Sequence, residues 1–431
     1  MKLTEKIVDI LKKEVVPAMG CTEPVAVALA CAKAKELIDC DEIDKIDILV
    51  SPNIYKNGLC VGIPNTKEVG LEIAAALGVV AGESQKELNV LAGIEKEAIH
   101  RAKRLQNSNK ISLGIKDTIE KVYVEVNINA KFKNSKVIIS EKHNHFSYLE
   151  KNGQILFEEE KKTKKEEDSS NWLYNLSICE IIKIIEEIPY EEIEFMLEGI
   201  ELNEKIAMVG LKNKMGMGVG TALYENMQKG ILSDDLINQA MMLTAGASDA
   251  RMSGIEMSVM SSNGSGNNGL TAILPIVAYK NKFDVDQERL AKAIAISHMV
   301  NSYVKHYIGR LSAICGCGVA AATGSSVAIG WLMGANSKEI DGIIKNMIAN
   351  LSGMICDGAK VGCALKLATS ASAAIQSVLL ALNGAIVPAQ NGIVGETAEE
   401  TIKNLGVVSS EGMNITDQVI LKVMKSMQKG A

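Results

Sequence analysis

Four of the nine cysteines lie in one stretch of small and apolar residues, as Cys315-Gly316-Cys317 and as Cys356-Asp357-Gly358 followed by Cys363. A thiol in such surroundings is often only a small hydrophobic group of the core. The neighbouring glycines, however, let the backbone approach a bulky group and turn its amides toward it. Three thiolates converging here could therefore hold an iron-sulfur cluster whose open iron would act as a Lewis acid.

Spacing alone leaves other interpretations of these cysteines open. A structural zinc site usually shows pairs of cysteines separated by about two to four residues. Here Cys315 and Cys317 form only a C-x-C pair, and six residues separate Cys356 from Cys363. Zinc is thus disfavoured, whereas a cluster and a set of buried core thiols are both compatible with the sequence.

Cys21 differs from the other cysteines because it follows a glycine and directly precedes a helix predicted over residues 25–37. The positive end of a helix macrodipole lowers the pKa of a thiol and favours the thiolate. We therefore expect Cys21 to be a reactive thiolate. We interpret the four cysteines without such a setting as structural thiols, namely Cys31, Cys40, Cys60 and Cys179.

Two polar segments have the composition to bind a small anionic molecule. Residues 51–58 are predicted to form a loop of hydrogen-bond donors with the cation of Lys56, and an ordinary turn fits them equally well. Residues 264–269 match the dinucleotide pattern G-x-G-x-x-G, but the strand that should precede it and the strand that should follow it are missing. A glycine-rich loop whose amides and Asn267 and Asn268 side chains bind a carboxylate fits better.

The histidines give weak metal-binding signals. His143 and His145 would share one face of a strand, but no third ligand lies near them, so we interpret them as a partly exposed pair on a sheet. His298 and His306 lie eight apart on one predicted helix, where packing in the core or behind the site is the simpler interpretation.

The elements that must position these residues form two regions, which predicts an α+β fold. Residues 1–170 are expected to form a smaller mixed α/β domain, with packing of the helices of residues 1–40 on the helical domain as an alternative. Residues 171–431 are expected to form a large all-helical domain that carries the clustered cysteines. The nearly uninterrupted run of charges over residues 158–168 is the predicted linker. In the first region we predict helices over residues 3–16, 25–37, 67–80 and 85–105, and strands over 43–50, 122–130 and 136–140 followed by further short strands. In the second region we predict helices over residues 177–188, 190–210, 236–245, 287–308, 337–354 and 416–427.

Composition excludes several classes of partner. Nucleic-acid binding is not indicated, because the formal charge is −6 and the chain has no long basic run. With only five Phe and two Trp, the chain also has few aromatic side chains for base stacking. The apolar runs 311–336 and 367–395 are rich in small residues and lack aromatic belts, so we expect core helices and no membrane span. Unpaired cysteines without an apolar leader predict a cytoplasmic, reducing location.

Taken together, these segments resemble the L-cysteine desulfidase family, which is related to the alpha chain of the iron-sulfur L-serine dehydratases. The resemblance covers essentially the whole chain. It rests on Gly20-Cys21-Thr22-Glu23-Pro24, Ser51-Pro52-Asn53 with Lys56-Asn57-Gly58, residues 263–269, Gly316-Cys317-Gly318, and Cys356-Asp357-Gly358 with Cys363. It implies a [4Fe-4S] cluster and no pyridoxal phosphate, and β-elimination of L-cysteine to pyruvate, ammonia and hydrogen sulfide.

The resemblance also implies roles for single residues. Cys317, Cys356 and Cys363 would carry the cluster, with Cys317 preferred over Cys315 because glycine precedes the ligand in the family pattern. Cys21 would be the catalytic base. The residues expected to bind the substrate are Thr22, Asn53, Lys56, Asn57 and Asn267.

One departure from the pattern bears on the substrate. The Ser-His-Thr segment of the serine dehydratases is matched at best by Cys21-Thr22, which favours a thiol substrate and keeps L-serine as the alternative. The sequence is also compatible with a pyridoxal-phosphate lyase, a non-catalytic iron-sulfur protein or a purely structural helical protein. The expected partner is a small amino acid, and pairing into a homo-oligomer stays open.

Overall fold

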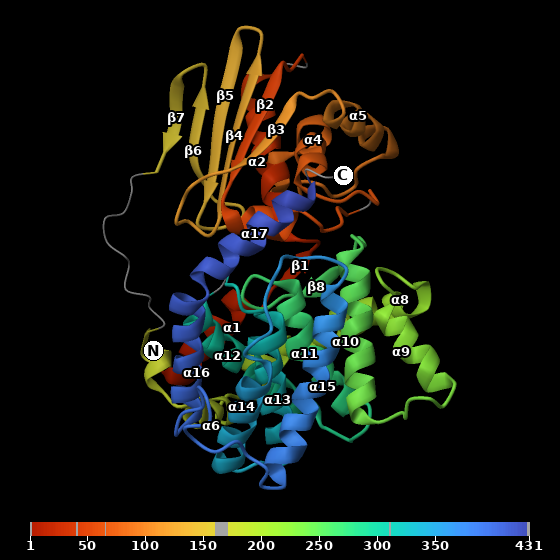
Figure 1. Cartoon of the computed structure of the whole chain (residues 1–431), viewed down its shortest axis with the longest axis vertical. Helices are drawn as coiled ribbons and strands as arrows, with labels where there is room; N and C mark the ends of the chain where they lie inside the picture. Colours follow the sequence, from red (N-terminus) through yellow and green to blue (C-terminus); the bar gives the residue numbers. More distant parts are fainter. Residues whose placement is uncertain (1, 40–41, 65, 160–170, 310–311, 429–431) are drawn as a thin grey trace.

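The structure, a computed structural model, describes residues 2–39, 42–64, 66–159, 171–309 and 312–428. Among these residues, the two largest hydrophobic cores lie beneath a β-sheet and within a larger body of helices (Figure 1). This confirms the predicted α+β class. The predicted linker falls mostly on residues outside the described ones, as does Cys40, so the boundary at residue 170 stays a prediction.

The sheet has the strand order β3-β2-β4-β5-β6-β7 in the described part of the chain. All neighbouring strands are antiparallel except β2 and β3, which run parallel. The strands are β2 (Lys45–Val50), β3 (Ile111–Ile115), β4 (Tyr123–Ala130), β5 (Lys133–Ser140), β6 (Phe146–Lys151) and β7 (Gln154–Glu158). The helices beside them are α2 (Thr22–Ile38), α3 (Pro52–Gly58), α4 (Leu71–Ala81) and α5 (Lys96–Gln106), with a 3-10 turn η1 (Ser84–Asn89).

Alternation of side chains explains which face of this sheet is covered. Val124, Val126 and Ile128 of β4 are fully buried and belong to the same core as α2 and α4. Glu125 points to the other face, where it pairs with Lys116 and Lys136. A strand whose apolar residues recur every second position buries one face only, and α2 packs on β4 and β5 to bury it.

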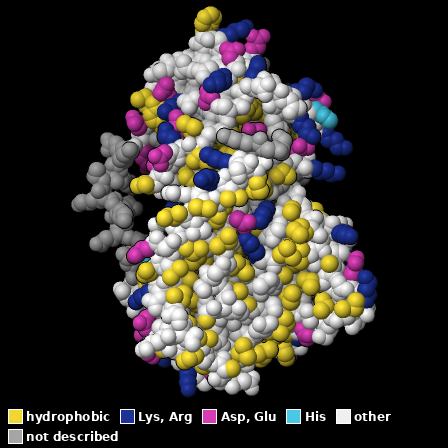
Figure 2. All heavy atoms as spheres, in the orientation of Figure 1, with side chains coloured by type: hydrophobic (Ala, Val, Ile, Leu, Met, Phe, Trp, Pro, Cys, Tyr) yellow, Lys and Arg dark blue, Asp and Glu magenta, His cyan; other side chains and the backbone are white. Residues whose placement is uncertain are grey.

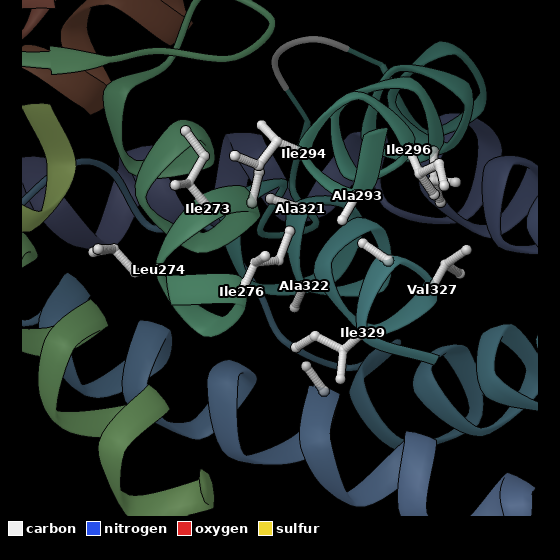
Figure 3. Close-up of a cluster of buried hydrophobic side chains, with 14 of the residues drawn as sticks. Ile273, Leu274, Ile276, Ala293, Ile294, Ile296, Ala321, Ala322, Val327 and Ile329 are labelled. Atoms are coloured by element: carbon white, nitrogen blue, oxygen red, sulfur yellow. The ribbon is translucent and has the colours of Figure 1, made fainter. Parts of the chain in front are cut away.

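The second body is almost entirely helical. Its elements are α1 (Leu3–Glu14), η2 (Asn171–Asn175), α6 (Ile178–Glu186), α7 (Tyr190–Ile193), η3 (Glu194–Leu197), α8 (Glu198–Asn213), α9 (Val219–Gln228), α10 (Leu236–Met252), α11 (Gly266–Lys280), α12 (Gln287–Ile308), η4 (Cys317–Ala321), α13 (Ala322–Leu332), α14 (Ser337–Leu351), α15 (Cys363–Leu382), α16 (Ala398–Val407), η5 (Val408–Gly412) and α17 (Asn414–Gln428). In its centre, α11, α12 and α13 contribute interlocking small and branched side chains, among them Ile276, Ile294 and Ile329 (Figure 3). Helices buried on all sides are expected to be apolar all round.

Three segments cross between the two bodies. Helix α1 packs on α6 and α12 of the helical body. The short strand β1 (Pro17–Met19) then pairs antiparallel with β8 (Ser258–Met260), directly before Cys21. Helix α17 returns from the helical body to α3, and its Leu421 joins the core beneath the sheet (Figure 1). The crossings bring residues from both ends of the chain to the junction of the two bodies.

Several local predictions were wrong. Residues 51–58 form helix α3 instead of a loop, because the Ser51 hydroxyl accepts a hydrogen bond from the Ile54 amide and Pro52 suits the first helical position. Residues 264–269 are mostly the first turn of α11. The helix predicted over 85–105 is interrupted by a turn before α5, and β3 was missed.

Helix α15 is long and apolar enough to span a membrane by length and composition alone. It packs on α10, α13 and α14, and 56% of its most apolar window is buried inside the protein. Burial of this kind is typical of the central helix of a folded body. Apolar side chains are also visible on the surface of the helical body (Figure 2). Leu379 and Leu380 of α15 are 40% and 50% exposed.

Candidate functional site

The two cysteine-bearing segments lie side by side. Ile314 and Ile355 form an antiparallel bridge, the Cys315 amide donates to the Met354 carbonyl at 2.8 Å, and the Cys356 amide donates to the Ala313 carbonyl at 2.7 Å. Cys317 begins the π-helical turn η4 immediately after this bridge. Insertions of this kind often mark functional sites. This backbone pairing brings together the two segments whose cysteines were predicted to be cluster ligands. The pairing itself could not be predicted from the sequence.

The segment from Cys356 to Cys363 is pressed against α3. Gly358 has a φ of +95°, and a Cβ there would lie 2.2 Å from the Lys56 carbonyl oxygen, so only glycine permits this approach. A parallel bridge between Cys60 and Lys360 continues the contact. Cys363 is the first residue of α15. The sheet-containing body therefore forms one wall of the thiol site.

Positive charges surround these thiols. Burial and the neighbouring Cys315 raise the pKa of Cys356, and Lys56 and Lys366 oppose that rise. The ammonium of Lys366 is 2.5 Å from the Asp357 carboxylate, which helps to hold the pKa of Asp357 at about 2 against the effect of burial. Bound metal would stabilise the thiolate form of each ligand, and these lysines would offset the resulting negative charge.

Cys21 reaches this site from the other body. It is 6% exposed and is the N-cap residue of α2, without a side-chain capping hydrogen bond. It forms a small buried cluster with Val61 and Met252, against which Cys363 packs. Burial raises the pKa of its thiol well above the usual value, and the nearby Glu23 raises it further, whereas Arg251 lowers it. The predicted thiolate is therefore wrong for this arrangement, because loss of water and a facing carboxylate outweigh the helix macrodipole.

Glu23 is the buried acid of this site. Its Oε2 accepts from the Cys21 thiol at 3.3 Å and its Oε1 accepts from Asn57 Nδ2 at 3.0 Å. Burial alone would raise the pKa of Glu23, but the positive charge that His143 carries when protonated, together with these hydrogen bonds, leaves it below the usual value. Glu23 is thus an anion at neutral pH, held against the thiol of the predicted base.

His143 was interpreted as part of a partly exposed pair on a sheet. The residue is partly exposed, as expected, but it lies in the turn between β5 and β6 and not on a strand. Its Nε2 atom is buried and has no hydrogen-bond partner among the described residues, and the ring interacts with Glu23. Burial lowers the pKa of His143, so its ring is neutral near pH 7. The turn between β5 and β6 therefore adds a histidine to the site.

Arg251 joins the Cys21 segment to helix α11. Its Nη2 donates to the Gly20 carbonyl at 2.7 Å and its Nη1 donates to Asn267 Oδ1 at 3.1 Å. Because Arg251 is only 6% exposed, its charge acts over a short distance in a weakly screening environment. Asn267, predicted to bind substrate, is thereby positioned beside Cys21.

The other predicted substrate residues lie on α2 and α3. Thr22 Oγ1 donates to Glu23 at 3.4 Å, and Asn53 is buried on α3. Lys56 is only 2% exposed, and its ammonium is 2.5 Å from Asp417 of helix α17. The structure therefore gives the Lys56 charge a partner within the protein, which the prediction of an anion-binding loop did not include.

The clustered cysteines have the donor chemistry of iron-sulfur ligands. No three His, Cys, Asp or Glu side chains converge closely enough to hold one metal ion in the part of the chain that the structure describes. In a cubane cluster each thiolate binds a different iron, so the ligands lie farther apart than those of one ion. The two segments joined by backbone pairing supply thiols, which are the donors that such a cluster requires.

Comparison with known families identifies the family of this chain. The sequence profile described as serine dehydratase alpha chain matches residues 85–422. This chain belongs to the serine dehydratase alpha chain family. The match includes Asn267, Cys317, Cys356 and Cys363, whereas Cys21 lies before it.

Full-length relatives cover the remaining residues. This member of the serine dehydratase alpha chain family is 65% identical over 428 residues to a UPF0597 protein of Alkaliphilus oremlandii, covering 99% of this chain and 100% of that protein. A UPF0597 protein of Alkaliphilus metalliredigens is 61% identical over 425 residues, covering 98% and 95% of the two chains. One from Clostridioides difficile is 55% identical over 425 residues, covering 98% and 99%. The similarity therefore extends through the N-terminal segment that carries Cys21.

Three residues of the site had no role in the sequence prediction: Glu23, His143 and Arg251. Glu23 follows Cys21 by two residues and could have been identified as a charge at an apolar helix start. Arg251 stands among small residues near the end of a long helix, which is also a detectable signal. The position of His143 depends on how the sheet packs against α2 and has no signal in the sequence.

Proposed function

We propose that the protein is a [4Fe-4S]-dependent lyase that eliminates sulfide from L-cysteine to give pyruvate and ammonia. One observation carries the proposal. Cys21, which comes from the N-terminal body, belongs to a small buried cluster against which Cys363 packs, and the two thiols interact electrostatically. Cys363 is one of three thiols whose segments are joined in the helical body. A candidate base thus lies beside candidate cluster ligands, and the serine dehydratase alpha chain family supplies the class of β-elimination.

The cluster would be held by Cys317, Cys356 and Cys363. When bound, it would supply an open iron that polarises the bond to the leaving sulfur. Cys315 is a second candidate for the first ligand, because its thiol interacts with both Cys356 and Cys363. Comparing the iron content of Cys317→Ser with that of Cys315→Ser separates the two, and the ligand is the one whose loss removes iron.

Proton transfer is assigned to Cys21. As placed, Cys21 is a protonated thiol at neutral pH, and it donates a hydrogen bond to Glu23. Arg251 is the charge that favours the thiolate. The thiolate then takes the α proton of the substrate, the carbon-sulfur bond breaks with loss of sulfide, and the remaining aminoacrylate hydrolyses to pyruvate and ammonia.

The substrate would bind between α2, α3 and the start of α11. Thr22, Asn53, Asn57 and Asn267 belong to these elements and would supply polar groups around the substrate. Asn57 retains an Oδ1 atom that is buried and unpaired among the described residues. The Lys56 ammonium pairs with Asp417. Lys56 would therefore act through its positive charge on Cys356 and would not bind the substrate directly.

The test is turnover by protein purified without oxygen, measured as pyruvate and sulfide released from L-cysteine and as pyruvate released from L-serine. We expect a higher kcat/KM for L-cysteine. Absence of pyruvate from both amino acids would contradict the lyase assignment. L-serine is the second candidate substrate because the matching family is that of a serine dehydratase chain, and a higher kcat/KM for L-serine would establish it.

A further inference from the structure

A tight turn next to Cys317 gathers buried polar side chains that the mechanism above does not use. Ser262 and Ser265 pair through two backbone hydrogen bonds of 3.1 Å, with Asn263 and Gly264 at positive φ between them. An Asn-Gly pair is the preferred centre of such a turn. The Ser265 hydroxyl lies 3.8 Å from the Cys317 thiol. The turn therefore stands at the edge of the proposed cluster site.

Hydrogen bonding around Ser262 fixes the tautomer of His298. The Ser262 hydroxyl oxygen accepts from Asn301 Nδ2 at 2.9 Å and from Asn263 Nδ2 at 3.1 Å. A serine hydroxyl has two acceptor positions and one proton, so its proton is left for His298 Nδ1 at 2.9 Å. Burial lowers the pKa of His298 to about 3, which leaves the ring neutral. Its single proton is therefore on Nε2.

Four polar atoms around the turn then lack partners. His298 Nε2, a donor, Asn301 Oδ1, an acceptor, and both side-chain atoms of Asn268 are buried without a hydrogen bond among the described residues. The three side chains are at most 1% exposed. A buried, unpaired polar group costs about 1–3 kcal/mol, and native proteins rarely leave several together. The set holds both donors and acceptors, which is what a zwitterion requires.

We propose that Asn268, His298 and Asn301 bind the carboxylate and ammonium groups of an α-amino acid beside Cys317. His298 Nε2 and Asn268 Nδ2 donate to the carboxylate, and Asn301 Oδ1 and Asn268 Oδ1 accept from the ammonium. The assignment rests on the proposed function for the identity of the amino acid and extends it, because it names the groups that orient the substrate relative to the thiols.

Asn268 offers a clean test because its side chain makes no hydrogen bond to lose. Asn268→Leu has a similar volume, so the free protein should be as stable as the wild type or more stable. Its binding of L-alanine, which carries both charged groups and has no leaving group, should weaken about tenfold or more. Propionate and ethylamine, which each lack one of the two groups, should bind the wild type more weakly than L-alanine.

Asn203 provides the matched control. It is fully buried, and both ends of its amide bind the backbone of Met260, at 2.8 and 3.4 Å. Asn203→Leu should therefore lower thermal stability but leave the affinity for L-alanine unchanged.

The measurement is calorimetric titration of L-alanine, with thermal unfolding, on full-length protein purified without oxygen. L-alanine binding that Asn268→Leu weakens and Asn203→Leu preserves supports the site, even if neither L-cysteine nor L-serine yields pyruvate, in which case only the proposed function fails. Wild-type affinity in Asn268→Leu, or no binding of L-alanine at millimolar concentration, overturns the site, even if L-cysteine is turned over.

Discussion

The thiol of Cys21 lies between opposite charges. Glu23 faces it at 3.3 Å, and Arg251 approaches from the carbonyl side of Gly20. The carboxylate favours the protonated thiol and the guanidinium favours the thiolate. In a dry site such opposing charges make proton position sensitive to small changes. This is the setting that a group needs to release and recover a proton in each turnover.

Replacing Cys21 tests its role as the base. Cys21→Ala should keep the iron content of the wild type and lower turnover of L-cysteine about 100- to 10,000-fold, since general-base assistance contributes that much. Cys31→Ala is the matched control, because Cys31 is a fully buried thiol on the same helix. Wild-type turnover in Cys21→Ala would show that the base is another group.

Replacing Glu23 tests the charge balance through pH. Glu23 raises the pKa of Cys21 by its charge and by accepting a hydrogen bond from the thiol, so Glu23→Gln should lower that pKa. The rate of alkylation of Cys21 by iodoacetamide should then rise at lower pH than in the wild type, because the thiolate is the reacting form. Mass spectrometry of the modified peptide gives the profile. A profile shifted to higher pH would contradict the placement of Glu23.

The sequence was informative about residue types and less so about environments. Cys21, Cys363 and Asn267 were selected from motifs, and the structure brings each to the junction of the two bodies. The thiolate expectation for Cys21 failed because its neighbours Glu23 and Arg251 and its loss of water are set by tertiary packing. His143 could not be placed because its contact with Glu23 depends on how a β-turn lies against α2.

At the scale of elements, helix α17 holds the site through α3. The Asp417 carboxylate pairs with the buried Lys56, and the Lys425 ammonium lies 5.7 Å from the centre of the Tyr55 ring. Lys56 in turn carries the carbonyl against which Gly358 packs. The last helix of the chain therefore supports the wall of the thiol site without contributing a ligand.

Removing Asp417 and removing Lys56 should lower the stability of the protein by different amounts. Asp417→Ala leaves the buried ammonium of Lys56 without its carboxylate and should lower the free energy of unfolding by about 2 kcal/mol. Lys56→Met removes the buried charge itself and should cost less. Urea unfolding measures both. Glu83→Ala, which breaks an exposed pair with Lys86, is the control and should change stability by less than about 0.5 kcal/mol.

An equal or larger loss of stability in Lys56→Met would contradict this assignment of the pair. It would mean that packing of the lysine stem outweighs the unpaired charge.

Elements with complete local signals were predicted best. Helix α12 begins after Asp286, whose side chain accepts from the Arg289 amide, and ends before Gly309, and its bounds were those predicted. Helix α3 has similarly clear signals in Ser51 and Pro52 but was predicted to be a loop, because its asparagines and glycine are also typical of turns. Strand β3 was missed because its pairing with β2 is a contact between distant segments.

At the scale of the whole molecule, the two bodies are joined by chain crossings as well as by surface contact. The N-terminal helix packs in the helical body, and the C-terminal helix packs against the sheet-containing body. The site uses this arrangement because Cys21 comes from one body and the clustered thiols from the other. The positions at the junction were not predictable from the chain order, which suggested two successive domains.

Leu421 tests the crossing of α17. It is 7% exposed in the core beneath the sheet, whereas Val423 on the same helix is 51% exposed. Leu421→Ala should lower the free energy of unfolding by about 2–4 kcal/mol, as is usual for a core leucine. Val423→Ala should lower it by about 0.5 kcal/mol or less. Equal effects in urea unfolding would show that α17 does not anchor on that core.

The iron and acid-labile sulfide content of protein purified without oxygen tests the central claim most directly. We predict about four irons and four sulfides per chain, as a cubane cluster requires, and loss of most of the iron in Cys356→Ser. A wild-type protein without iron under strictly anaerobic conditions would contradict the claim. Cys317, Cys356 and Cys363 would then be core thiols, and the elimination chemistry would need another source of activation.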